Sequence, residues 1–218
     1  MLFRSRSYPQ TNLNEVAKAA SIYSLAVRDD GTIFAAGHSP TKNNKDTDIF
    51  VARYTPDGAL DANFANAGTL LSDQGGLEYV RGVALTNDGA LLLGGSGGPE
   101  GKMMLVCLDE DGKLRPSFGN GGRQFLSVEG GSSERYYGRA LSLFPDGRAL
   151  LIGDNDGKIA ALCVQPDGSL DTTFGRGGGV RTDLGSWSGA LAGALTPDGK
   201  ILVSGFSRKD FSSTSCWA

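Results

Sequence analysis

The sequence predicts an all-β fold, a β-propeller built from four repeats of about 54 residues with four antiparallel strands each. Three observations predict this fold. Glycine supplies 33 of the 218 residues, which is well above its ordinary share of roughly 7%. Asp-Gly pairs recur along the chain at a nearly constant spacing. Each pair joins two short apolar runs, which is the pattern of a β-hairpin.

The first hairpin of each repeat turns at one of these Asp-Gly pairs. Their glycines lie 58, 58 and 52 residues apart, at Gly31, Gly89, Gly147 and Gly199. Because glycine accepts the positive φ that a tight turn needs, the apolar runs on either side are predicted to be two strands, called a and b. Replacement of Gly147 by valine is therefore expected to destabilise the protein.

A second hairpin supplies strands c and d of the repeat. Its Asp-Gly turn lies at Gly58, Gly112 and Gly168, and a phenylalanine follows each turn. The glycine runs 119–122 and 175–179 come next in two of the repeats and are predicted to be tight bends between c and d. They are not predicted to hold phosphate, because no helix follows them to offer its N-terminal amides.

Two strings in these hairpins carry a family resemblance. The first hairpin has the form A-L-x-P-D-G-K-x-L-V-x-G at 194–205, and the second has P-D-G-S-L-D-x-x-F-G-x-G-G at 166–178. Over residues 22–218 the chain resembles the delta-60 repeat family of bacterial β-propeller proteins. The resemblance implies the fold. It implies little about activity, because the family consists largely of proteins of unknown function and its motif contains no catalytic residue.

The last repeat is shorter than the others. Cys107 and Cys163 each lie five residues before the glycine of a second hairpin, on strand c. Cys216 lies 17 residues after Gly199, between the corresponding distances of 18 and 16 in the other two repeats, so residues 211–217 are predicted to be strand c of the last repeat. Cysteines at this place are most simply small buried hydrophobic residues.

The N-terminus is expected to complete the last blade by supplying its strand d from residues 2–6. The chain would then be a single domain, 1–218, with repeats at about 22–76, 77–131, 132–185 and 186–218 plus 1–8. A ring closed in this way leaves no long edge strand unpaired, and a monomer is expected. In the alternative, residues 6–14 are a diverged copy of 53–61, and the chain is part of a larger ring, either completed by a homodimer or truncated.

The charge and hydropathy of the chain exclude several classes of partner. The formal net charge is −3 and the isoelectric point is about 5.2, so the basic footprint of a nucleic-acid-binding protein is absent. No apolar stretch approaches the roughly 18 residues that span a membrane. No signal peptide is visible, because no apolar segment follows the N-terminal arginines. The sequence therefore leaves the compartment open: it is cytoplasmic by default, and the family resemblance is compatible with export.

No catalytic arrangement stands out in the sequence, and the chain is not expected to be an enzyme. The string 94–98 fits G-x-S-x-G, but a strand follows it rather than the helix of a nucleophile elbow. His38 is the only histidine, which leaves little for a Ser-His-Asp triad. The cysteine spacing is unlike that of a metal site. Neither a cofactor nor a metal is expected.

The loops between strands b and c and between strands d and a share one face of a propeller, and they are irregular in this chain. Binding residues are often carried by such loops on a rigid scaffold, and Trp, Tyr and Arg are enriched at binding hot spots. The candidate ligand- or partner-binding residues on this face are His38, Tyr79, Arg81, Arg135, Tyr136, Tyr137 and Trp187. A packing role is the alternative for the aromatic members.

The function predicted from these observations is a non-catalytic binding or scaffold propeller that engages a protein partner through its irregular face. An inhibitor or immunity-type protein is one form of this function. A carbohydrate-binding, lectin-like propeller is the alternative, in which Trp187 and the tyrosines would stack on sugar rings. A hydrolase or lyase with carboxylates at the channel mouth is a weaker alternative.

Overall fold

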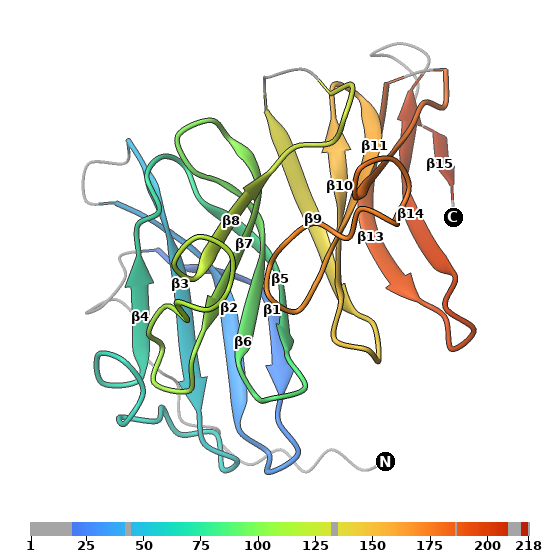
Figure 1. Ribbon diagram of the computed structural model, residues 1–218. Coiled ribbons are helices and arrows are strands. Elements are labelled where there is room, and N and C mark those ends of the chain that lie inside the picture. Colours follow the sequence, from blue (N-terminus) through green and yellow to red (C-terminus); the bar gives the residue numbers. More distant parts are fainter. Residues whose placement is uncertain (1–18, 42–44, 132–134, 186, 209–214, 218) are drawn as a thin grey trace.

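Four antiparallel sheets follow one another along the chain (Figure 1). The computed structural model describes residues 19–41, 45–131, 135–185, 187–208 and 215–217. Within these ranges every regular element is a strand and none is a helix. The all-β propeller fold predicted from the sequence is therefore confirmed. No helix in the described ranges is long and apolar enough to span a membrane.

Each sheet is one blade, and its strands are hydrogen-bonded in the order of the chain. The first blade contains β1 (Ser21–Val27), β2 (Ile33–Pro40), β3 (Thr47–Tyr54) and β4 (Thr69–Ser72). The second contains β5 (Tyr79–Leu85), β6 (Leu91–Gly97), β7 (Lys102–Leu108) and β8 (Arg123–Leu126). The third contains β9 (Tyr136–Leu143), β10 (Ala149–Asn155), β11 (Lys158–Val164) and β12 (Gly179–Thr182). The fourth contains β13 (Trp187–Leu195), β14 (Ile201–Arg208) and β15 (Ser215–Trp217).

The first hairpin of every blade closes on its Asp-Gly glycine, as predicted. The φ angles of Gly31, Gly89, Gly147 and Gly199 are 88°, 83°, 88° and 79°. In all four turns the glycine N–H donates to the carbonyl three residues earlier at 2.9 Å. A side chain at these positions would be strained, because L-residues rarely adopt positive φ. The turns thus bring the two flanking apolar runs into register as a and b strands.

The hydrophobic core is divided among the spaces between blades. Successive side chains of a strand point to opposite faces of the sheet, and blades two and three are covered on both faces. Every residue of β6 and β10 is therefore buried. Phe34 and Met104 belong to the cluster between the first and second blades, Leu92 and Leu151 to the next, and Ile152 to that between the third and fourth.

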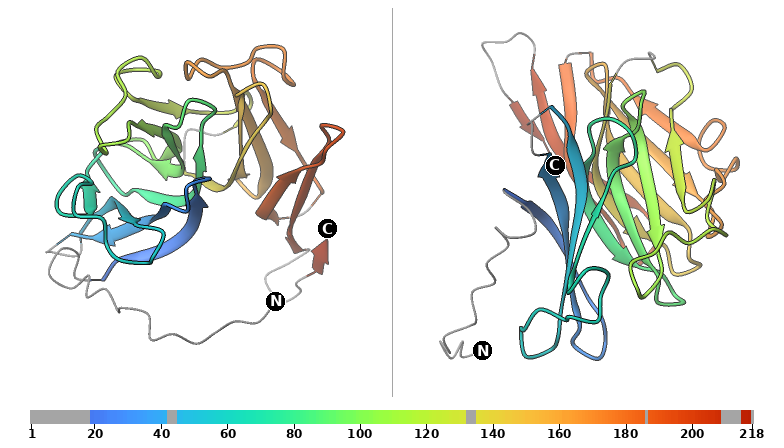
Figure 2. Two further views of the ribbon diagram at one scale, coloured as in Figure 1. Left: turned by 90° about the horizontal axis from the view of Figure 1, so that it is seen from below. Right: turned by 90° about the vertical axis from the view of Figure 1, so that its left-hand side faces the viewer.

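The blades form an open arc around a common axis (Figure 2). The innermost strands β1, β5, β9 and β13 each contact the next in this order. β15 pairs with β14, which confirms the predicted strand c of the last blade. The proposed contribution of residues 1–8 to strand d lies outside the described residues. The first and last blades have no such neighbouring blade on their outer faces among the described strands.

Candidate functional site

A β-bulge interrupts the innermost strand of every blade at the same repeat position. The pairing of strands a and b skips one residue in each case, eight residues before the turn glycine. The skipped residues are Tyr23, Arg81, Arg139 and Leu191. Bulges re-aim a side chain out of the regular alternation of a strand. Each blade thus presents one side chain that is set apart from the packing between sheets.

A glycine on the neighbouring strand admits each bulge. These glycines lie six residues after the turn glycine, at Gly37, Gly95, Gly153 and Gly205. A Cβ on any of them would overlap a carbonyl oxygen of the opposing innermost strand, for example that of Tyr137 in the case of Gly153. Only glycine allows this close approach of the two backbones. The recurrence of these glycines was therefore a sequence signal for the bulges.

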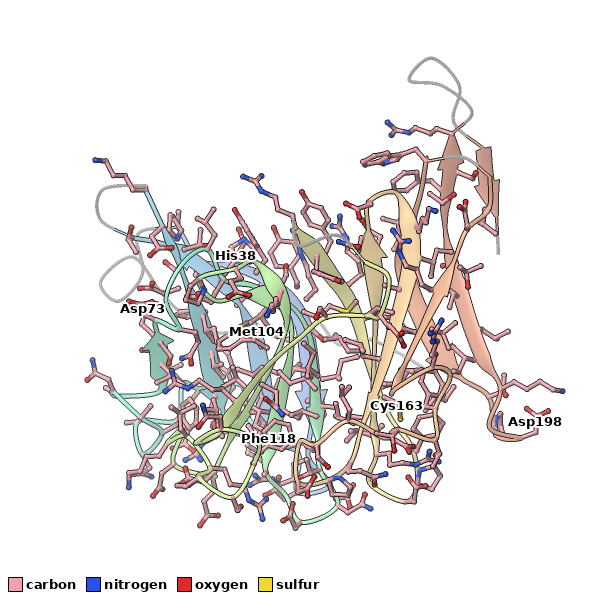
Figure 3. All side chains as sticks on the ribbon, turned by 45° about the horizontal axis from the view of Figure 1, so that its top comes forward. His38, Asp73, Met104, Phe118, Cys163 and Asp198 are labelled. Atoms are coloured by element: carbon pink, nitrogen blue, oxygen red, sulfur yellow. The ribbon has the colours of Figure 1, made fainter. Side chains whose placement is uncertain are left out.

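Three of the predicted site residues meet at the junction of the first two blades. The rings of His38 and Tyr79 contact edge to face at 5.0 Å. The Arg81 guanidinium lies 3.7 Å from the centre of the Tyr23 ring, and Tyr23 stacks on His38 at 5.0 Å. Figure 3 shows His38 toward one end of the sheets, whereas Phe118 lies toward the other end. Tyr23 was not among the predicted site residues, yet it holds His38 and Arg81 together.

The environment of His38 favours its neutral form. Its side chain is buried, and its Nδ1 has no hydrogen-bond partner among the described residues. Burial lowers the pKa of His38, and the positive charge of Arg81 lowers this pKa further. The cluster therefore combines a neutral imidazole with a permanently charged guanidinium on one face of the molecule.

A groove lies on the same face between the second and third blades. Its volume is about 590 Å³. Tyr79 lines it from the first of these blades, together with the glycine-rich connection 97–101 between β6 and β7. Arg135, Tyr136 and Tyr137 line it from the start of β9. Four of the seven predicted site residues thus share one concave surface, and Tyr79 connects this surface to the His38 cluster.

The tyrosines of the groove differ in how much surface they offer. Tyr136 is buried, and its hydroxyl donates to the Val128 carbonyl at 3.4 Å, so it packs between blades. Tyr137 is exposed, but the Arg139 guanidinium lies 5.0 Å from the centre of its ring. Arg139 also pairs with Asp154 at 3.4 Å. The groove is therefore lined by tyrosine edges and charged groups more than by open ring faces.

Trp187 does not reach the groove. It begins β13 in the fourth blade and is exposed. A Cβ on Gly157 would lie 2.7 Å from its indole ring, so the ring packs on the turn between β10 and β11. The structure thus separates Trp187 from the groove, because its ring packs where the third and fourth blades meet, whereas the groove lies between the second and third blades.

A buried carboxyl group lies beneath the glycine-rich connection of the groove. Glu78 accepts hydrogen bonds from the backbone N–H groups of Gln74 and Gly98, at 3.1 and 3.4 Å. Its side chain has no exposed surface. Desolvation is the largest effect on this group and raises the pKa of Glu78 to about 7. Glu78 was not among the residues predicted from the sequence, because its burial arises only in the folded protein.

The family comparison agrees with this geometry. Residues 28–64 match the family model described as "Domain of unknown function (DUF5122) beta-propeller". The chain carries the repeat of a β-propeller family of unknown function. The matched segment runs from the first a-to-b turn to Phe64, which is the phenylalanine that follows the second hairpin turn. The resemblance to a propeller repeat family is therefore confirmed. No curated protein sequence matches the chain.

Two solved structures are similar to this chain at low sequence identity. A catalytically inactive virginiamycin B lyase from Staphylococcus aureus with quinupristin has a TM-score of 0.51 and 11% identity, covering 95% of this chain and 57% of that chain. An exo-1,5-α-L-arabinanase from a bovine ruminal metagenomic library has a TM-score of 0.47 and 13% identity, covering 89% and 76%. This chain thus spans less than two thirds of the lyase. The likeness to the lyase concerns the fold alone.

Three further carboxylates gather near Glu78. Oxygen atoms of Asp46, Asp48 and Asp73 lie within 4.8 Å of one another. Partial burial and the two neighbouring carboxylates raise the pKa of Asp48. Figure 3 shows Asp73 toward the same end of its blade as His38. Oxygen donors of this kind suit a hard cation such as Ca²⁺, and they make this corner of the irregular face strongly negative.

The two thiols in the described part of the chain are buried and unreactive at neutral pH. Cys107 and Cys163 are buried on β7 and β11, as predicted for this repeat position. Burial raises the pKa of each thiol to about 11. A thiol in this state carries almost no thiolate at neutral pH and is a poor nucleophile.

Proposed function

We propose that this chain is a non-catalytic binding module that engages a protein partner through its irregular face. The observation that carries the proposal is the groove of about 590 Å³, which Tyr79, Arg135 and Tyr137 line and the His38 cluster extends. Tyrosine and arginine on loops of a rigid scaffold are typical of protein-binding surfaces.

The charges of this face favour a partner with acidic side chains near the groove. Within the described part of the chain, neither Arg81 nor Arg135 forms an ion pair with a carboxylate. Each guanidinium offers several N–H donors that fit a carboxylate. The acidic corner at Asp46, Asp48 and Asp73 would in turn suit a basic residue of the partner.

A glycan fits the same groove less well. Sugar recognition by aromatic residues relies on an open ring face, and Tyr136 is buried while Arg139 lies close to the ring of Tyr137. Trp187 is exposed but packs on the turn at Gly157, away from the groove. The lyase with a similar fold lends no support to an enzymatic function, because at 11% identity the likeness extends to the fold alone.

The test compares three immobilised forms of the chain in affinity capture from a lysate of the source organism, with quantitative mass spectrometry. Arg135→Glu reverses a charge in the groove. Arg176→Glu is the matched control, because Arg176 is largely exposed on the connection between strands c and d, outside the groove. We expect the wild-type chain and the control to retain the same proteins, and Arg135→Glu to retain them about tenfold less, which corresponds to about 1.4 kcal/mol.

Equal retention by all three forms would contradict the proposal, as would loss with Arg176→Glu alone. Saturable binding to a glycan array without any retained protein would favour the lectin-like alternative instead.

A further inference from the structure

The outer face of the first blade exposes apolar residues that the other blades bury. Leu25 of β1 has 63% of its surface exposed. Its repeat equivalent in the second blade, Val83, has only 8% exposed, because it packs against the first blade. Val27 is exposed to 61%, whereas its equivalent in the third blade, Leu143, packs in the core between blades. This end of the arc therefore presents the surface by which a blade packs on the blade before it.

The opposite end of the arc shows the complementary surface. Leu202 of β14 is 59% exposed. Its equivalents in the first three blades, Phe34, Leu92 and Leu150, are exposed by only 1%, 2% and 0%. In each of those blades the residue packs against the following blade. The fourth blade thus presents the surface by which a blade packs on the blade after it.

The interfaces inside the molecule show how these two surfaces would meet. A Cβ on Gly94 of β6 would lie 3.1 Å from the Cβ of Leu141 of β9. Leu92 and Leu143 lie two residues nearer the turns on these same strands, and both belong to one hydrophobic cluster. The last and first blades carry Leu202 and Val27 at the positions of this second pair. Leu202 and Val27 thus occupy the two sides of an interface that the internal blades already make.

We propose that a second copy of this chain covers both surfaces, so that the fourth blade of each copy packs on the first blade of the other. A second copy is the expected partner because the two free surfaces correspond to the two sides of the internal interfaces: the fourth blade presents the side that packs on a following blade, and the first blade presents the side that packs on a preceding one. Within one copy the open arc keeps the two surfaces apart (Figure 2). A head-to-tail contact of this kind closes when two copies make it twice about a two-fold axis. The product is a dimeric ring of eight blades.

The first measurement is the mass of the full chain by light scattering and sedimentation over a range of concentrations. We expect the wild-type chain to approach twice 22.7 kDa. Leu202→Asp and Val27→Asp should each shift the protein to 22.7 kDa. Leu184→Asp is the control, since Leu184 is also exposed but lies in the connection between β12 and β13, and it should remain a dimer. Melting curves check that every variant is folded.

The second measurement establishes which surfaces meet. Val27→Cys and Leu202→Cys are prepared as separate proteins, each with Cys216 replaced by serine, and oxidised alone or mixed. The proposal expects a disulfide-linked dimer only in the mixture. A monomeric wild-type chain at every concentration would overturn the proposal. So would cross-linking of either variant with itself alone, or an intramolecular disulfide in a monomer that carries both cysteines.

Discussion

At the scale of single residues, Gly153 shows how the repeat depends on the absence of a side chain. Its Cβ would overlap the carbonyl oxygen of Tyr137 on the paired strand. Nothing flexible can move aside, because the obstructing atom belongs to the backbone. The bulge at Arg139, which places a guanidinium beside Asp154 and Tyr137, therefore requires glycine at this position.

Gly153→Ala should lower the free energy of unfolding by about 3 kcal/mol, the upper range for overpacking a closely packed site. Gly89→Ala is the matched control. A Cβ on Gly89 would meet nothing within 4 Å, so only its positive φ of 83° opposes the change. We expect that substitution to cost about 1 kcal/mol. Urea unfolding of both variants measures the difference, and equal losses would contradict a steric role for Gly153.

Glu78 should make the stability of the protein depend on pH. Its pKa is raised to about 7 in the folded protein from 4.5 in the unfolded chain. The folded state therefore holds a proton that the unfolded state releases between these values, and the free energy of unfolding falls as pH rises through this window. Above pH 7 the buried charge costs on the order of 2–3 kcal/mol relative to pH 4.

Glu78→Gln removes this charge. We expect the stability of the variant relative to wild type to improve by roughly 2 kcal/mol between pH 5 and pH 8, measured by urea unfolding at both values. Glu110→Gln, at an exposed site, should show no such change. A constant difference between Glu78→Gln and wild type across this range would show that Glu78 is already ionised when the protein is folded at pH 5.

At the scale of elements, the strands were predictable because the turns between them have a recognisable sequence pattern. Each Asp-Gly pair fixes where one strand ends and the next begins, and alternation then fixes which residues face the core. The bulges were not predicted. The glycines six residues after each turn glycine recur in the sequence, but the extra residue that they admit, such as Tyr23, is identified only from the register of the paired strands.

The candidate site was predictable as a face but not as a set of contacts. The order of strands places His38, Tyr79 and Tyr137 at the same end of their blades. It does not say that Tyr79 contacts His38 while Trp187 packs one blade away. Glu78 escaped notice because its burial arises from two loops that are separated in the sequence, around Gln74 and Gly98.

At the scale of the whole molecule, stability should be uneven from blade to blade. Repeat proteins are stabilised mainly by contacts between neighbouring units, and the second and third blades have such contacts on both faces. The outer faces of the first and fourth blades expose Leu25 and Leu202. The ends of the arc should therefore open more readily than its centre.

Hydrogen exchange measured by mass spectrometry can follow this gradient in the Leu202→Asp variant, in which the ends are expected to stay uncovered. Amides of β6, β7, β10 and β11 should exchange most slowly, and those of β1, β13 and β14 should exchange fastest, because the first and fourth blades each have only one packed face. In the wild-type chain, protection of β1, β13 and β14 should rise with protein concentration as a second copy covers them. Protection that is uniform across the blades, or equal in both proteins at every concentration, would mean that the end faces are already as well covered as the internal interfaces.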